Sequence, residues 1–220
     1  MTGFRRRMAM AAGLLAAFAA WTIAVQHVDV QPIGPQGSQV GFAAVNQLVH
    51  RLTGTNFALY VITDWLGCIP VLVCGGFGVL GLVQWVRRRS IARVDFSILV
   101  LGGFYMAVMA AYVLFEVYAV NARPVLIDGR LETSYPSSTT MLVLCVIPTA
   151  VMQLRDRVRN VRCRAWITWG GAVFAVLMVT GRLLSGVHWL TDFAGGALLS
   201  AGLVMLYSAV CCLEKKQAQT

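Results

Sequence analysis

The chain has 220 residues, of which 58% are hydrophobic and 12% are charged, and its formal net charge is +9. This composition excludes an ordinary soluble domain, in which about 25% of the residues are charged. It predicts an all-α integral membrane protein in which residues 1–220 form a single polytopic domain.

Six apolar segments are long enough to cross a bilayer as helices, which takes about 20 residues. They are residues 8–25, 57–86, 96–120, 138–154, 165–184 and 192–213. The fourth is the shortest. The first has a basic start and an apolar run, which is also the pattern of a signal peptide. We interpret it as an uncleaved anchor, because it would add packing to a six-helix bundle.

The basic residues predict the orientation of this bundle. All but four of the 18 lysines and arginines lie before the first segment or after the second, fourth and sixth segments. By the positive-inside rule, both termini are then cytoplasmic and the intervening loops face outward. We therefore interpret the positive charge as a topology signal and not as affinity for nucleic acid. The four exceptions, on the outer side, are Arg51, Arg123, Arg130 and Arg182.

The first outer loop, residues 26–56, starts with prolines and glycines and continues with apolar residues at roughly helical spacing. These apolar residues are Val40, Ala43, Ala44, Leu48 and Leu52. The pattern predicts either an amphipathic helix on the outer membrane interface or a loop packed on the top of the bundle.

Two carboxylates, Asp64 and Glu116, lie at the outer ends of the second and third segments. Ionisable residues inside a span usually face the bundle interior and often have a function. The second segment also contains Pro70, which is followed by several glycines, so we expect a kinked helix there.

We expect neither a metal nor a cofactor. The six cysteines lie in the spans or on the inner side, which favours neither a disulfide framework nor a metal site. His27 and His50 are on the outer side, but no cluster of acidic and histidine ligands surrounds them.

The fourth segment begins with Pro136, which is followed by the hydroxyl residues Ser137, Ser138, Thr139 and Thr140. Such residues are typical of a helix N-terminus, where they cap free backbone N–H groups. The same N–H groups and the helix dipole also bind phosphate. At this point the pattern allows both plain capping and a phosphate site.

The fifth and sixth segments are joined by GRLLSGVHWLTD, which contains Arg182, His188 and Asp192. Positions four apart share one face of a helix, so Asp192 can accept a hydrogen bond from one ring nitrogen of His188 and leave the other directed outward. This arrangement prepares a nucleophilic histidine. The alternative is a polar cluster that only anchors a helix end at the interface.

Arg123 precedes Pro124 at the outer end of the third segment, at the membrane depth of Arg182. Two guanidinium groups beside a helix N-terminus and a carboxylate-supported histidine indicate a clamped phosphoryl group. The alternative is a pair of arginines that merely reach the interface.

These residues resemble the type 2 phosphatidic acid phosphatase superfamily, whose members are six-span lipid phosphatases. The ordered motifs of that family are a Lys followed after six residues by Arg-Pro, then Pro-Ser-Gly-His, then Ser-Arg-x5-His-x3-Asp. The resemblance implies that Arg123 and Arg182 bind phosphate with Ser137 and Ser138. It also implies that His188 forms a phosphohistidine, oriented by Asp192, without a metal. The implied place is the outer face of a plasma membrane of the bacterial type.

The chain departs from the family at four motif positions. Glu116 stands in place of the Lys, and Thr139 in place of the His that protonates the leaving group. The milder changes are Gly181 for Ser and Ser138 for Gly. The sequence thus keeps the nucleophile and lacks the usual general acid.

Three explanations of the missing acid are open. A lipid diphosphate, such as a polyprenyl diphosphate, releases a stable anion that needs little protonation. Alternatively, Glu116 stays protonated and donates the proton. In the third, the protein binds or transports a phospholipid without hydrolysing it. A phosphotransferase, in which an acceptor hydroxyl replaces water, is a further reading. The lipid and the oligomeric state stay open.

Overall fold

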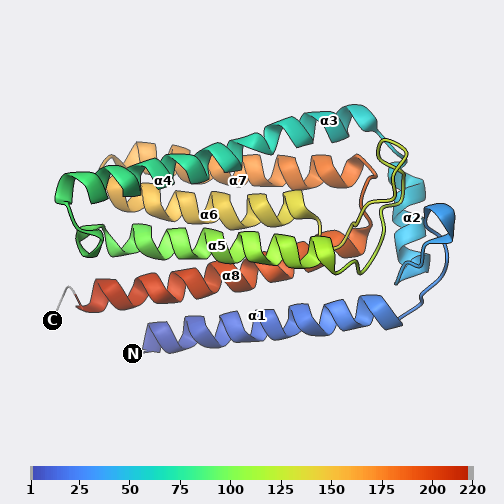
Figure 1. The fold of residues 1–220 in the computed structure, drawn as a ribbon, viewed down its shortest axis with the longest axis horizontal. Helices are drawn as coiled ribbons and strands as arrows, with labels where there is room; N and C mark the ends of the chain where they lie inside the picture. The colour runs from blue at the N-terminus through green and yellow to red at the C-terminus, as the bar shows by residue number, and fades with distance from the viewer. Residues whose placement is uncertain (1, 218–220) are drawn as a thin grey trace.

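The computed structural model describes residues 2–217 of the chain. Six spans in it are long and apolar enough to cross a membrane (Figure 1). They are α1 (Thr2–His27), the pair α3 (Phe57–Leu66) and α4 (Cys68–Arg88), α5 (Phe96–Val117), α6 (Ser138–Arg157), α7 (Val161–Leu184) and α8 (Leu190–Gln217). Residues 2–217 contain isolated bridges but no β-strand. The predicted all-α class and the six spans are confirmed, and the chain is a multi-pass membrane protein.

Several predicted boundaries differ from the helix ends by a few residues, and the structure gives a reason for two of them. The third span ends at Val117 rather than at residue 120, because the chain turns there into a long loop. The fifth span begins at Val161 rather than at residue 165. Its start is set by Asn160, whose side-chain oxygen accepts hydrogen bonds from the backbone N–H groups of Arg162 (2.9 Å) and Cys163 (3.3 Å). A capping side chain thus outweighs the low hydropathy of the first turn.

The expected kink in the second span is present, although it lies before the proline. The helix is interrupted at Gly67, whose N–H contacts the carbonyl oxygens of Thr63 and Asp64, both at 3.0 Å. Pro70 has no N–H, so the carbonyl of Leu66 one turn earlier loses its helical partner. The break between α3 and α4 follows from that loss.

The helix α6 lies at the centre of the bundle and packs against α7, α8, α5 and α4. It has the lowest mean hydropathy of the six spans, 1.3, and half of its apolar window is buried. Protein and not lipid therefore covers most of it. The first span, α1, packs along α8 at the edge of the bundle (Figure 1).

Both described ends of the chain lie at one end of the bundle, and the short helix α2 (Ala43–Thr53) lies across the other end (Figure 1). The buried Asn46 of α2 donates to the Thr191 hydroxyl of α8 at 3.0 Å. Leu48 and Leu52 are exposed on its opposite side. The loop of residues 26–56 therefore contains the predicted helix, and that helix is docked on the bundle. The cytoplasmic placement of the termini stays a prediction.

Candidate active site

His188 lies in the turn between α7 and α8, and its side chain is buried. Gly186, in the same turn, has a φ of +67° and touches the backbone of Gly54 so closely that no Cβ fits. The Nδ1 atom of His188 is 3.1 Å from the carbonyl oxygen of Ser134 and 3.2 Å from its hydroxyl. Because a carbonyl only accepts, Nδ1 carries the proton and Nε2 keeps its lone pair. Nε2 is buried, and no described residue bonds it.

Asp192 lies on the Nδ1 side of the ring, as predicted, but its contact with His188 is long. Its Oδ2 atom is 3.5 Å from Nδ1. The same oxygen accepts from the backbone N–H of Trp189 at 2.8 Å and from the Ser134 hydroxyl. The predicted contact is therefore present but longer than a normal hydrogen bond, because His188 precedes the start of α8 at Leu190 and is not held in helical i, i+4 geometry.

The surroundings of His188 keep its ring neutral. The pKa of His188 is lowered to about 4: burial is the largest cause, the positive charges of Arg123 and Arg182 contribute to the lowering, and the nearby Asp192 opposes it. At physiological pH the Nε2 lone pair is therefore free for nucleophilic attack.

Arg182 occupies the last turn of α7, and its side chain is buried. The guanidinium carbon lies 4.6 Å from the centre of the Tyr60 ring. Its Nη1 atom is 3.4 Å from the Thr63 hydroxyl and 3.6 Å from a carboxylate oxygen of Asp64. These contacts hold the cation at the end of the helix, where the helix dipole also favours it.

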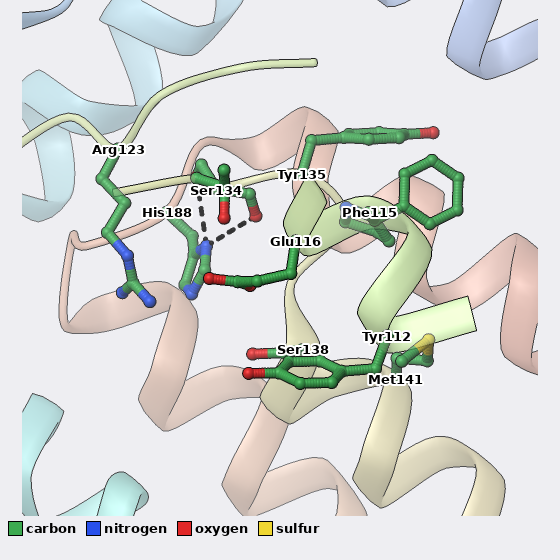
Figure 2. Close-up of a pocket in the computed structure, with 11 residues that line it drawn as sticks. Tyr112, Phe115, Glu116, Arg123, Ser134, Tyr135, Ser138, Met141 and His188 are labelled. Carbon is green, nitrogen blue, oxygen red and sulfur yellow. Dashed lines mark hydrogen bonds between the residues drawn. The ribbon is translucent and has the colours of Figure 1, made fainter. Parts of the chain in front are cut away.

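Arg123 lies on the first arm of a hairpin-like loop between α5 and α6. Its backbone N–H donates to the carbonyl of Glu132 on the second arm at 3.0 Å, and its Nε atom is 3.1 Å from the Glu132 carboxylate. Figure 2 shows its guanidinium beside the ring of His188. Of the four arginines predicted on the outer side, Arg51 and Arg130 are exposed, and only Arg123 and Arg182 are buried at the site.

The start of α6 lies where the hydroxyl residues predicted it, with Ser137 as the N-cap and Ser138 as the first helical residue. Of the two alternatives left open, plain capping is not what the Ser137 side chain does: it caps no backbone N–H, and its oxygen accepts from the Thr140 hydroxyl at 3.1 Å. Its own N–H donates to the backbone carbonyl of Asp192 at 3.2 Å. The backbone N–H groups of the first turn are thus not capped by the Ser137 side chain. A helix end that binds phosphate needs such uncapped N–H groups.

A small cavity of about 20 Å³ lies in front of His188, with room for one or two waters (Figure 2). Arg123, Ser134, Ser138 and Glu116 line it together with His188. Glu116 comes from the last turn of α5, is exposed, and directs its carboxylate toward the ring of His188 in Figure 2. Its place within a span had suggested that Glu116 faces the bundle interior. Instead, Glu116 lies at the mouth of the site.

A second, larger and mostly apolar cavity lies between α4, α5 and α6. Its volume is about 480 Å³, and Ser138 lines both cavities. Thr139, which replaces the histidine of the second motif, lines this apolar cavity but not the one in front of His188.

The sequence model of the PAP2 superfamily matches residues 73–216, more than half of the chain. The chain belongs to the PAP2 superfamily. Among solved structures, its fold is similar to the first transmembrane PAP2 type phosphatidylglycerolphosphate phosphatase from Bacillus subtilis. The two are 19% identical with a TM-score of 0.55, and the match covers 91% of this chain and 94% of that chain. No curated protein matches the chain significantly.

The resemblance to the PAP2 superfamily is thus confirmed, and every predicted site residue lies within the matched segment. The PAP2 fold brings Arg123, Ser138 and Glu116 to one cavity with His188, and it places Asp192 behind the ring. Sequence reasoning missed Ser134, which contacts both His188 and Asp192. Its only signal is its place three residues before Ser137, next to the predicted helix start.

Proposed function

We propose that this PAP2 protein is a membrane lipid phosphatase that acts through a phosphohistidine on His188. The observation that carries the proposal is the buried, neutral imidazole, whose unpartnered Nε2 faces a cavity flanked by arginine. Such a group is an activated nucleophile. Membership of the PAP2 superfamily supports the same activity.

The reaction proceeds in two displacements at phosphorus. In the first, Nε2 of His188 forms a bond to phosphorus, and the bond from phosphorus to the lipid oxygen breaks. In the second, water attacks the phosphorus, the P–N bond breaks, inorganic phosphate leaves with the oxygen of the water, and the ring is neutral again. Arg123 and Arg182 compensate the charge of the transferred oxygens, and Asp192 compensates the cationic ring of the intermediate.

The apolar cavity supports a lipid as the substrate. It meets the small cavity at Ser138 and is lined by apolar side chains such as Val71, Met106 and Leu142. A phosphate held by the arginines would therefore place its apolar tail between α4, α5 and α6. The similar fold named as a phosphatidylglycerolphosphate phosphatase supports the same substrate class. We place the reaction at the outer face of a plasma membrane, following the distribution of the basic residues.

The leaving group distinguishes two versions of the proposal. Thr139 lines only the apolar cavity, whereas Glu116 shares the small cavity with His188. Glu116 is therefore our candidate for the acid that protonates the lipid oxygen as its bond to phosphorus breaks. A lipid diphosphate, whose leaving phosphate is already a stable anion, needs no such donor.

The test of the activity is phosphate release by the purified protein from polyprenyl diphosphate, polyprenyl phosphate, phosphatidate and phosphatidylglycerol phosphate. We expect turnover of at least one of them, a trapped phosphoryl label on His188, and no turnover by His188→Ala. His27→Ala, which removes an exposed histidine at the end of α1, serves as the matched control and keeps full activity. No release from any substrate, or an active His188→Ala variant, would refute the proposal.

Glu116→Gln tests the proton donor. If Glu116 is the acid, the variant loses about 100-fold in kcat on a lipid monophosphate, because general acid catalysis contributes about 10²-fold or more. The rate on polyprenyl diphosphate changes much less. Full turnover of the monophosphate by Glu116→Gln would remove Glu116 from this role.

A further inference from the structure

Ser134 occupies the position between Asp192 and His188. Its side chain is buried, and it makes three polar contacts with the two residues. Its hydroxyl donates to Oδ2 of Asp192 and lies 3.2 Å from Nδ1 of His188, and its backbone carbonyl lies 3.1 Å from the same nitrogen. No residue of the predicted site has comparable contact with both members of the His–Asp pair.

The direct path from carboxylate to imidazole is weak. The separation of 3.5 Å between Oδ2 and Nδ1 exceeds the usual 2.7–3.2 Å of an N–H···O bond. Oδ2 is also occupied by the Trp189 N–H and the Ser134 hydroxyl. Among the residues that the structure describes, the hydroxyl of Ser134 is thus the group that connects Asp192 to His188 by hydrogen bonds.

We propose that Ser134 is a positioning residue through which Asp192 supports His188, a role that rests on the proposed function of His188 as the nucleophile. A hydroxyl suits this place because it accepts and donates at once. It accepts from Nδ1–H, which it shares with the backbone carbonyl of Ser134, and it donates its own proton to Asp192. When Nε2 bonds to phosphorus and the ring becomes cationic, both hydrogen bonds become charge-assisted and therefore stronger. No proton needs to leave Nδ1 during the step.

The position of Ser134 is fixed by contacts on both of its sides. Its backbone N–H donates to the carbonyl of Asn121 on the other arm of the hairpin at 2.9 Å. The next residue, Tyr135, has its hydroxyl 2.7 Å from that of Thr22 in α1 and stacks on Phe18. Helix α1 lies outside the segment matched by the PAP2 model, residues 73–216. The first span therefore takes part in holding the hydroxyl in place.

A double-mutant cycle of Ser134→Ala and Asp192→Asn tests this role. Loss of a charge-assisted hydrogen bond predicts that Ser134→Ala lowers kcat by about 10- to 100-fold and leaves KM within about 2-fold. If Asp192 acts through Ser134, the double variant is no slower than Asp192→Asn alone, because the path is already broken. Ser200→Ala, which removes another buried serine hydroxyl, in the middle of α8, is the matched control and keeps the parental kcat.

Independent effects that multiply in the double variant, or a Ser134→Ala variant with the parental kcat, would overturn the role of Ser134. A second measurement does not depend on turnover: nitrogen NMR of ring-labelled histidine, with His188→Ala to assign the signal. We expect the proton of the neutral ring on Nδ1, and a proton on Nε2 contradicts the proposal. An active His188→Ala variant refutes the phosphatase mechanism itself. An inactive His188→Ala variant together with a fully active Ser134→Ala variant refutes only the positioning role of Ser134.

Discussion

The burial of the His188 ring determines how the site responds to pH. Burial lowers its pKa to about 4, below the unperturbed value of about 6.5. The unfolded chain therefore binds a proton at this residue before the folded chain does. The stability that His188 contributes is present above pH 6.5 and is lost as the pH falls toward about 4. Below that value Nε2 is protonated and has no lone pair for phosphorus.

We therefore predict that His188 titrates at about pH 4 in the folded protein. The measurement is an NMR titration of the ring nitrogens in detergent micelles without substrate, assigned with His188→Ala. This readout avoids the ionisation of the phosphate substrate, whose second pKa is about 6. A midpoint near 6.5 would show that the ring is hydrated and not buried as described.

Single residues differ in how far the sequence predicts them. Arg182, His188 and Asp192 are close in the chain, and their spacing already indicates a common site. Arg123 is indicated by its membrane depth beside Arg182 as well as by the resemblance, whereas the role of Glu116 rests on the motif position that it occupies. Ser134 follows from neither source. Its contact with His188 exists only because the hairpin loop meets the α7–α8 turn, a contact between residues 54 positions apart.

At the scale of elements, hydropathy predicts the spans well because each must match the thickness of a bilayer. The errors occur where polar contacts decide, as at Asn160, whose side chain starts α7 early. The hairpin between α5 and α6 is also beyond such reasoning, since its bridge between Ala122 and Thr133 has no hydrophobic pattern. Yet this hairpin carries Arg123 and Ser134 to His188.

The contact between the Tyr135 ring and Gly195 of α8 leads to a prediction at this scale. A Cβ on Gly195 would lie 2.5 Å from the Tyr135 ring, so Gly195→Ala must displace that ring from its place beside Ser134. We expect a loss of about 1–3 kcal/mol in stability, as is usual for overpacking, and a lower kcat. Thermal unfolding in detergent and phosphate release measure the two effects.

The control for this prediction is Gly170→Ala, in α7, where an added Cβ meets no atom within 4 Å. We expect it to keep both the melting temperature and kcat of the parent. If Gly195→Ala behaves like Gly170→Ala, then the Tyr135 ring is not needed to hold the loop.

At the scale of the whole molecule, the apolar cavity continues along the bundle. Cys74, Gly102 and Tyr105 line both the cavity next to the active site and a further cavity of about 470 Å³ between α4 and α5. The glycines of these helices leave the space open, because no side chain fills it. The molecule thus offers a long apolar path that starts at the end of the bundle where His188 lies.

Gly102→Leu should block this path. We expect KM for long-chain lipid phosphates to rise about 10-fold, because the loss of contact with about two methylene groups costs ~1.6 kcal/mol. Activity on a short-chain phosphate ester stays unchanged. Gly103→Leu is the matched control, because Gly103 also has open space around it but lines neither cavity. Equal KM values for the two variants on a long-chain lipid would place the tail elsewhere.

The acidic partners of the two arginines bear on how the product leaves. Arg123 has Glu132 at 3.1 Å, and Arg182 has Asp64 at 3.6 Å. If His188 forms the proposed phosphohistidine, each cation therefore has a carboxylate within reach once the P–N bond is broken. Free phosphate would then compete with these two carboxylates for the guanidinium groups. On the proposed mechanism, the site would thus exchange one anion for another at each turnover.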